Sequence, residues 1–234
     1  MPVSAKIFLH QETIPLEEIA EKLEGWREEE TFEVPGENYS LLANIEEVEY
    51  DDEELSGIYR YDSVAMHTWR GVIAATPYTT SAPFVFTEQD DQKFLIVLAP
   101  KSTSNKVANQ LSMILHGVQG AIVEPMIRSA LFEEFQEGTE TTKIMLFEDI
   151  DIPNIDKATL YGGDGGNVQQ TNLYGNFIAH GRPSYMVAKT KKRGWTVGIV
   201  RDCTIVVFNT VMKSAFIEFI KEEILPMTLR RNRD

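Results

Sequence analysis

The stretch from residue 38 to residue 98 limits the possible folds more than any other part of the chain. It is rich in aromatic and β-branched residues and shows no helical periodicity that competes with strands. Two pairs of strand candidates lie in it, each pair separated by a short polar turn: Tyr39–Tyr50 with Leu55–Thr68, and Phe84–Thr87 with Lys93–Leu98. Because such short connections join antiparallel neighbours, both pairs are predicted to form β-hairpins.

An amphipathic helix is predicted before this β region. A strand candidate at Lys6–His10 is followed by Thr13 and Pro15, which are typical of a helix start. Apolar side chains then recur at helical spacing: Leu16, Ile19, Ala20, Leu23 and Trp26. Seven glutamates lie on the other side, which we interpret as a solvated face: Glu17, Glu18, Glu21, Glu24, Glu28, Glu29 and Glu30.

The rest of the chain favours the same mixture of helices and hairpins. Three more helices are predicted, from Ser102 or Ser104 to Gly117, from Pro125 to Gly138, and from Thr210 to Pro226. Five strand candidates lie among them: Lys143–Phe147, Ala158–Tyr161, and a meander of Ser184–Lys189, Trp195–Val200 and Thr204–Phe208. The order strand, turn, strand, helix occurs at Phe84–Leu115 and again at Thr196–Leu225, so two similar halves are an open alternative.

Together these patterns predict an α+β fold, a largely antiparallel sheet system with about four helices. A chain of 234 residues buries about 70% of the surface that its unfolded form exposes, which is enough for a sizeable core. Because no linker is evident, residues 1–234 are predicted to form one compact body. Residues 1–117 and 118–234 are possible subdomains, the first of them acidic.

The charge of the chain is unevenly distributed. The net charge of −14 comes almost entirely from residues 1–117, which hold 8 basic and 21 acidic residues. From Arg182 onward the balance reverses, with 11 basic against 5 acidic residues. Nucleic acid is therefore a disfavoured partner for the chain as a whole, because phosphate binding needs clustered Lys and Arg. Only the C-terminal quarter has such a cluster.

Several protein classes are excluded or disfavoured by what the sequence lacks. No apolar run approaches the roughly 20 residues of a membrane-spanning helix, so no membrane partner is expected. Cys203 has no second cysteine to pair with, and the first residues do not have the pattern of a secretory signal. A cytoplasmic location is the expectation that follows.

Basic residues gather in one predicted hairpin and in the C-terminal tail. The hairpin holds Lys189, Lys191, Lys192 and Arg193 beside Trp195, and the tail holds Arg230, Arg231 and Arg233. Such a hairpin is able to grip a nucleic-acid backbone or to dock on an acidic protein surface. The acidic first half supplies such a surface, so self-association by complementary charge is a third reading, and a plain solvated hairpin is a fourth.

Two further segments are weak candidates for chemistry. Glycine-rich loops can form anion-binding nests, and one such loop consists of Gly162, Gly163, Gly165, Gly166 and Asn167, although no nucleotide-binding fingerprint surrounds it. The acidic run before it contains Asp149, Asp151 and Asp156, which are candidate ligands of a divalent metal. A mobile surface loop and a solvated acidic connection are the simpler interpretations of these two segments.

The sequence favours binding over catalysis. No zinc-binding histidine pair, nucleophile elbow or nucleotide loop is present, and no cofactor is expected. The leading hypothesis is a non-enzymatic intracellular binding or regulatory protein that contacts a protein or anionic partner through its sheet faces or its C-terminal basic hairpin. The alternative is a metal-dependent hydrolase of a phosphate ester, with the three aspartates holding the cation and the glycine-rich loop receiving the phosphate.

Overall fold

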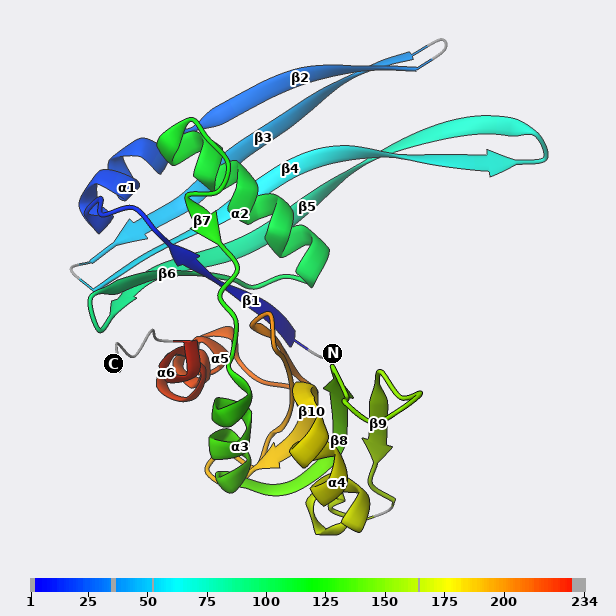
Figure 1. Ribbon diagram of the computed structural model, residues 1–234. Helices are drawn as coiled ribbons and strands as arrows, with labels where there is room; N and C mark the ends of the chain where they lie inside the picture. Colours follow the sequence, from blue (N-terminus) through cyan, green and yellow to red (C-terminus); the bar gives the residue numbers. More distant parts are fainter. Residues whose placement is uncertain (1–2, 35–36, 52, 164, 229–234) are drawn as a thin grey trace. The chain divides into compact units, whose positions relative to one another are not determined.

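The computed structural model describes residues 3–34, 37–51, 53–163 and 165–228 of the chain (Figure 1). The chain divides into two compact units, one formed by Phe8–Val123 and the other by Met1–Ile7 with Glu124–Asp234. The boundary falls inside the first strand, β1 (Val3–His10). After Val123 the chain belongs to the other unit again, and this position lies near the predicted subdomain boundary after Gly117. One compact body over residues 1–234 stays a prediction.

The unit Phe8–Val123 contains an antiparallel sheet with strand order β2-β3-β4-β5-β6-β1. Its other strands are β2 (Arg27–Val34), β3 (Glu37–Tyr50), β4 (Glu54–Trp69), β5 (Val72–Gln89), β6 (Gln92–Val97) and the short β7 (Ile122–Val123), which pairs with β1. Two helices, α1 (Leu16–Leu23) and α2 (Lys101–His116), share one core with the sheet. Buried residues of both helices pack with Tyr59 and Phe84 of the sheet.

The hairpins β4–β5 and β5–β6 of this unit each close with a tight turn. Asp90 and Asp91 join β5 to β6, and Arg70 and Gly71 join β4 to β5; all four residues have positive φ angles. Two consecutive residues with positive φ form the type I′ turn, whose twist matches that of the flanking strands. The predicted turn at residues 89–92 joins β5 to β6, whereas the turn at Arg70–Gly71 was not predicted. The predicted turn at residues 51–54 contains Asp52, which lies outside the described residues.

The other unit is built on the strand order β12-β11-β10-β8-β9, with the first residues of β1 paired to β12. Its strands are β8 (Thr139–Glu148), β9 (Ala158–Tyr161), β10 (Arg182–Thr190), β11 (Thr196–Val200) and β12 (Thr204–Val207). Its helices are α3 (Ser129–Glu137), the 3₁₀ turn Val168–Gln170, α4 (Asn172–His180), α5 (Lys213–Phe219), the π-helix Ile220–Ile224 and α6 (Leu225–Thr228).

Pro226 explains why the last helix changes its winding. In a regular α-helix a proline ring clashes with the carbonyl group four residues earlier, here that of Glu222. The residues before Pro226 adopt π-helical winding, and the N–H of Leu225 bonds to the carbonyl of Ile220, five residues back. The helix thus continues through the proline with one wider turn, and this turn carries Glu222 and Glu223.

The α+β class and the largely antiparallel sheet are confirmed. Each unit contains a hairpin followed by a helix, β5–β6–α2 in one and β11–β12–α5 in the other, which agrees roughly with the predicted order. Among the described residues, no helix is long and apolar enough to cross a membrane.

One prediction of local structure is wrong, and one helix was not predicted at all. Glu28, Glu29 and Glu30 belong to strand β2, because α1 ends at Leu23. A strand exposed on both faces has no apolar alternation to reveal it, so its glutamates looked like the continuation of the helix. No element was predicted over helix α4, because none of its residues is buried and it therefore has no apolar stripe.

Candidate interaction surfaces

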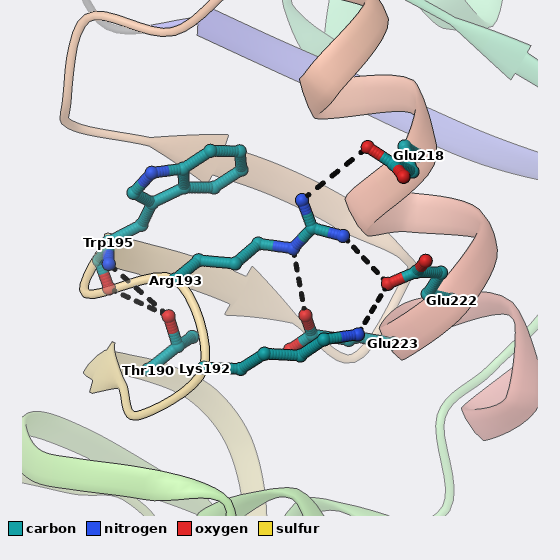
Figure 2. Close-up of polar contacts among 7 residues, drawn as sticks. All are labelled: Thr190, Lys192, Arg193, Trp195, Glu218, Glu222 and Glu223. Atoms are coloured by element: carbon teal, nitrogen blue, oxygen red, sulfur yellow. Dashed lines mark hydrogen bonds and ion pairs between the residues drawn. The ribbon is translucent and has the colours of Figure 1, made fainter.

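The basic hairpin is neutralised within its own unit by the wide turn of the C-terminal helix (Figure 2). Arg193 lies 3.7 Å from Glu218, 2.7 Å from Glu222 and 3.0 Å from Glu223, measured between guanidinium nitrogen and carboxylate oxygen atoms. Lys192 lies 2.6 Å from the same oxygen of Glu222. Only 14% of the Arg193 side chain is exposed, so this cluster holds its position mainly through internal contacts.

Aromatic rings enclose the other side of the same guanidinium. Its carbon lies 5.3 Å from the ring centroid of Trp195 and 5.9 Å from that of Phe219, and the two rings meet edge to face. A cation in this position over aromatic faces is stabilised by their quadrupoles. Hydrogen bonds from Lys192 and then from Arg193 lower the pKa of the Glu222 carboxyl, which keeps the cluster ionised at neutral pH.

The two remaining cations of the hairpin also have partners. Lys189 pairs with Glu140 at 2.7 Å, and the ammonium group of Lys191 donates to the carbonyl of Glu137 at 2.7 Å. An anionic partner would have to replace all of these contacts to bind the hairpin. Contact through this hairpin stays a prediction. The tail residues Arg230, Arg231 and Arg233 lie outside the described residues.

Backbone groups of the glycine-rich loop are already hydrogen-bonded within the chain. The N–H of Gly162 donates to Lys143 and that of Gly166 to Gly163, and a side chain at Gly162 would lie 2.7 Å from the carbonyl oxygen of Gly166. The side-chain oxygen of Asn167 accepts from the N–H groups of Thr142 and Gln169 and so caps the following turn. The glycines therefore permit a tight turn, and phosphate binding by this loop stays a prediction.

The three aspartates of the acidic run face different partners. Asp149 lies 3.6 Å from Arg182, Asp151 lies 2.8 Å from His180, and the backbone carbonyl of Asp156 accepts the N–H of Ile150. Within the described parts of the chain, no three His, Cys, Asp or Glu side chains are grouped so that they could hold one metal ion. The metal-dependent hydrolase thus has no geometric observation in its favour and stays a prediction.

A surface that the sequence reading did not single out lies on the hairpin of β4 and β5. Its outer part, residues 63–78, runs out beyond α2 as a two-stranded ribbon in Figure 1, and we name these residues the arm. Its register is continuous from Ser63 opposite Tyr78 to Trp69 opposite Val72. Large apolar side chains of the arm are about half exposed or more: Met66 49%, Val72 64%, Ile73 68% and Tyr78 51%.

The arm is also nearly free of charge. Between Ser63 and Thr87 the only charged residue is Arg70, whereas the chain-wide charged fraction of 25% would place about six there. The ladder between β3 and β4 ends at the base of the arm, where Ala43 pairs with Tyr61. The carboxylate of Asp62 then accepts the N–H of Leu42 at 3.0 Å, so a side chain takes the place of the next strand contact. Beyond that point β4 and β5 continue as a ribbon of two strands.

A signal for this surface was present in the sequence. The stretch from Ser63 to Thr87 lacks acidic residues although it lies in the acidic half of the chain. No element was predicted between Thr68 and Phe84, and the charge of these residues was not considered. No protein-family model and no curated protein matches this chain. The interpretation of each surface therefore depends on its own geometry.

Proposed function

We propose that this protein is a non-enzymatic binding protein, and that its partner is an uncharged, extended strand of a protein chain that pairs with the arm. The observation that carries the proposal is the combination of exposure and neutrality in residues 63–78. Charged residues make up 25% of the chain and are mostly exposed in folded proteins, so an exposed segment of 16 residues with a single charge is unusual here. Exposed apolar patches on soluble proteins commonly mark sites where another molecule binds.

The ribbon form of the arm supports the same proposal. A two-stranded hairpin is marginally stable in water without a third strand or a covering layer. Strand edges that stay exposed are usually protected by charge, by proline or by a covering element, because an open edge pairs with other chains. A partner strand would satisfy backbone groups of the arm and cover its apolar side chains in one step.

The arm is a better candidate for this contact than the basic hairpin. Binding at the arm would bury exposed apolar side chains without breaking the ion pairs of the hairpin. Binding at the hairpin would first have to separate Arg193 from three carboxylates. A cytoplasmic location belongs to the same proposal and is suggested by the single cysteine of the chain.

Photo-cross-linking in cells tests this proposal. A benzophenone amino acid replaces Ile73 on the arm in one variant and Phe32 on β2 in the other; both side chains are exposed and lie on hairpins of the same unit. We expect protein cross-links from position 73 and few or none from position 32. Cross-links of equal yield at the two positions, or none at position 73, would overturn the proposal.

A further inference from the structure

The two outer edges of the arm are distinguished by the direction of their backbone groups. Along an antiparallel strand, the N–H and C=O of one residue point to the same side, and that side alternates from residue to residue. The carbonyl of Pro83 accepts the N–H of Leu98 at 2.8 Å, on the β6 side of β5. Ile73, Ala75 and Pro77 are each an even number of residues from Pro83 along the same unbroken strand. Their backbone groups therefore point to the same side as those of Pro83, which is the outer edge of β5.

That outer edge of β5 is already protected. Pro77 has no N–H to offer to a further strand, and proline is tolerated in strands where its nitrogen faces the open side. The hydroxyl of Tyr39, on β3, donates to the carboxylate of Glu37 and also lies 3.4 Å from the carbonyl oxygen of Ala75. Because β4 and β5 twist across one another (Figure 1), this edge of β5 turns toward β3.

Among the residues that the structure describes, none protects the outer edge of β4 in this way. Val64, Met66 and Thr68 lie opposite Pro77, Ala75 and Ile73 in the ladder. Two residues directly opposite each other point their N–H and C=O groups either both toward each other or both away from each other. These three residues of β4 therefore direct N–H and C=O outward. The register from Glu54 to Trp69 contains no bulge, and residues 63–69 include no proline, Asp, Glu, Lys or Arg. This edge is ready to accept a strand.

We propose that the strand that pairs with this edge is β4 of a second copy of the chain, antiparallel about a two-fold axis at Met66. This inference rests on the proposed function and names the partner. A centre at Met66 pairs Val64 with Thr68 of the second copy and pairs Met66 with its own counterpart. All three outward residues then exchange backbone hydrogen bonds with one another across the two-fold axis.

Charge selects the same partner and the same register. With the centre at Met66, Asp62 lies opposite Arg70 of the second copy, and the reciprocal pair forms by symmetry. Arg70 is the only charged residue between Ser63 and Thr87, and this register brings it to the carboxylate of Asp62, which also accepts from Leu42 at 3.0 Å and from Thr79 at 2.6 Å. Elsewhere two copies that each carry a charge of −14 repel one another, and the neutral arm is where they can approach.

Single-cysteine cross-linking on the full chain, combined with sedimentation equilibrium, tests the inference. Cys203 is fully buried, so an introduced cysteine on the arm is the reactive thiol. Met66→Cys would form a disulfide between copies, because directly opposite residues in such a pair have Cα atoms about 5.5 Å apart. Ile73→Cys, exposed on β5 of the same arm, is the matched control and would not cross-link.

We expect the wild-type chain to sediment as a dimer at tens of micromolar. Arg70→Glu would raise its dissociation constant about tenfold, because two attractive pairs become repulsive, whereas Arg70→Lys would change it little. A monomer at every concentration, or equal cross-linking at positions 66 and 73, would overturn the inference. Cross-links from position 73 to other proteins, with a monomeric chain, would overturn it while leaving the proposed function standing.

Discussion

Two hairpins of one unit both have exposed strand edges, but they differ in the number of charged residues that they carry. The hairpin of β2 and β3, described over residues 27–34 and 37–44, carries six charged residues. The arm has the same number of residues and carries one. Charge on an edge strand prevents pairing with other chains, and its absence permits pairing. The difference indicates that the first hairpin is built to stay unpaired and that the second is built to be covered.

The largest expected effect concerns the core that both hairpins share. Phe84→Ala removes a ring that is 1% exposed and would lower the free energy of unfolding by about 3–5 kcal/mol. Phe32→Ala, on the charged hairpin, would cost less than about 1 kcal/mol, because that ring is 38% exposed. Urea unfolding of both variants measures the difference. Equal losses would show that the charged hairpin is packed as tightly as the base of the arm.

Low pH is expected to lower the folding stability of the same unit. The Nε2 atoms of His10 and His116 lie 2.7 Å apart, and burial, with His116 and Lys93 acting in the same direction, lowers the pKa of His10 from 6.5 to about 4. The unfolded chain therefore binds a proton that the folded chain does not accept. This stability is fully present above pH 6.5 and is lost as the pH falls toward 4, by about 3 kcal/mol.

Unfolding by urea at pH 7, 5.5 and 4.5 checks this dependence. His10→Gln is the control, because it removes the titrating group from the core. The pH profile of the variant is expected to be flatter than that of the wild type. Parallel profiles would show that other groups cause the loss.

A third substitution tests whether the arm or the basic hairpin of the other unit is responsible for self-association. Arg193→Ala leaves three carboxylates without their shared cation and would cost about 2 kcal/mol of stability. Self-association would be unchanged, because the arm is intact. Chemical unfolding and sedimentation of the same sample measure both quantities. A loss of association in this variant would move the contact back to the basic hairpin.

The charged hairpin can be made to resemble the arm. Replacing Glu28, Glu29 and Glu30 with threonine removes charge from an exposed strand and would change stability by less than about 0.5 kcal/mol. The variant would form additional, larger assemblies, because β2 is an edge strand of its sheet. Light scattering detects them. Unchanged size would mean that the charges on β2 do not prevent pairing.

The reverse change gives the arm the character of the charged hairpin. Met66→Lys places a charge at the centre of the proposed contact, on a side chain that is 49% exposed, so the stability of the single chain would change by no more than about 0.5 kcal/mol. Association would weaken at least tenfold, because two lysines would lie directly opposite each other across the paired strands. Glu29→Lys on β2 is the matched control. Sedimentation of the two variants side by side shows whether the effect is specific to the arm.

Strong local patterns explain how much of the fold could be predicted. The hairpins β3–β4 and β5–β6 were predicted, because their strands are rich in aromatic and β-branched residues and flank short polar turns. Helix α2 was predicted by its apolar stripe and by Gly117, which adopts the left-handed conformation at its end. Strand β2 and helix α4 were missed, because exposed elements do not carry the pattern that burial imposes.

The sites were harder to predict, because they depend on long-range contacts. The basic residues were correctly placed in one hairpin, but the glutamates that neutralise Arg193 lie 25 to 30 residues later in the chain. Glu218 lies on α5, and Glu222 and Glu223 lie on the π-helical turn before Pro226; no local sequence pattern shows that these side chains meet Arg193. The arm was missed for another reason: its signal is an absence of charge.

Hydrogen exchange of the wild-type chain tests the central claim most directly. Exchange is compared between the backbone amides of residues 63–69 on β4 and those of Arg27–Val34 on β2, at low and high protein concentration. We predict that protection of the outward amides of Val64, Met66 and Thr68 rises with concentration while that of β2 does not change. Equal exchange of both edges at every concentration would contradict the claim that the arm pairs with a second copy.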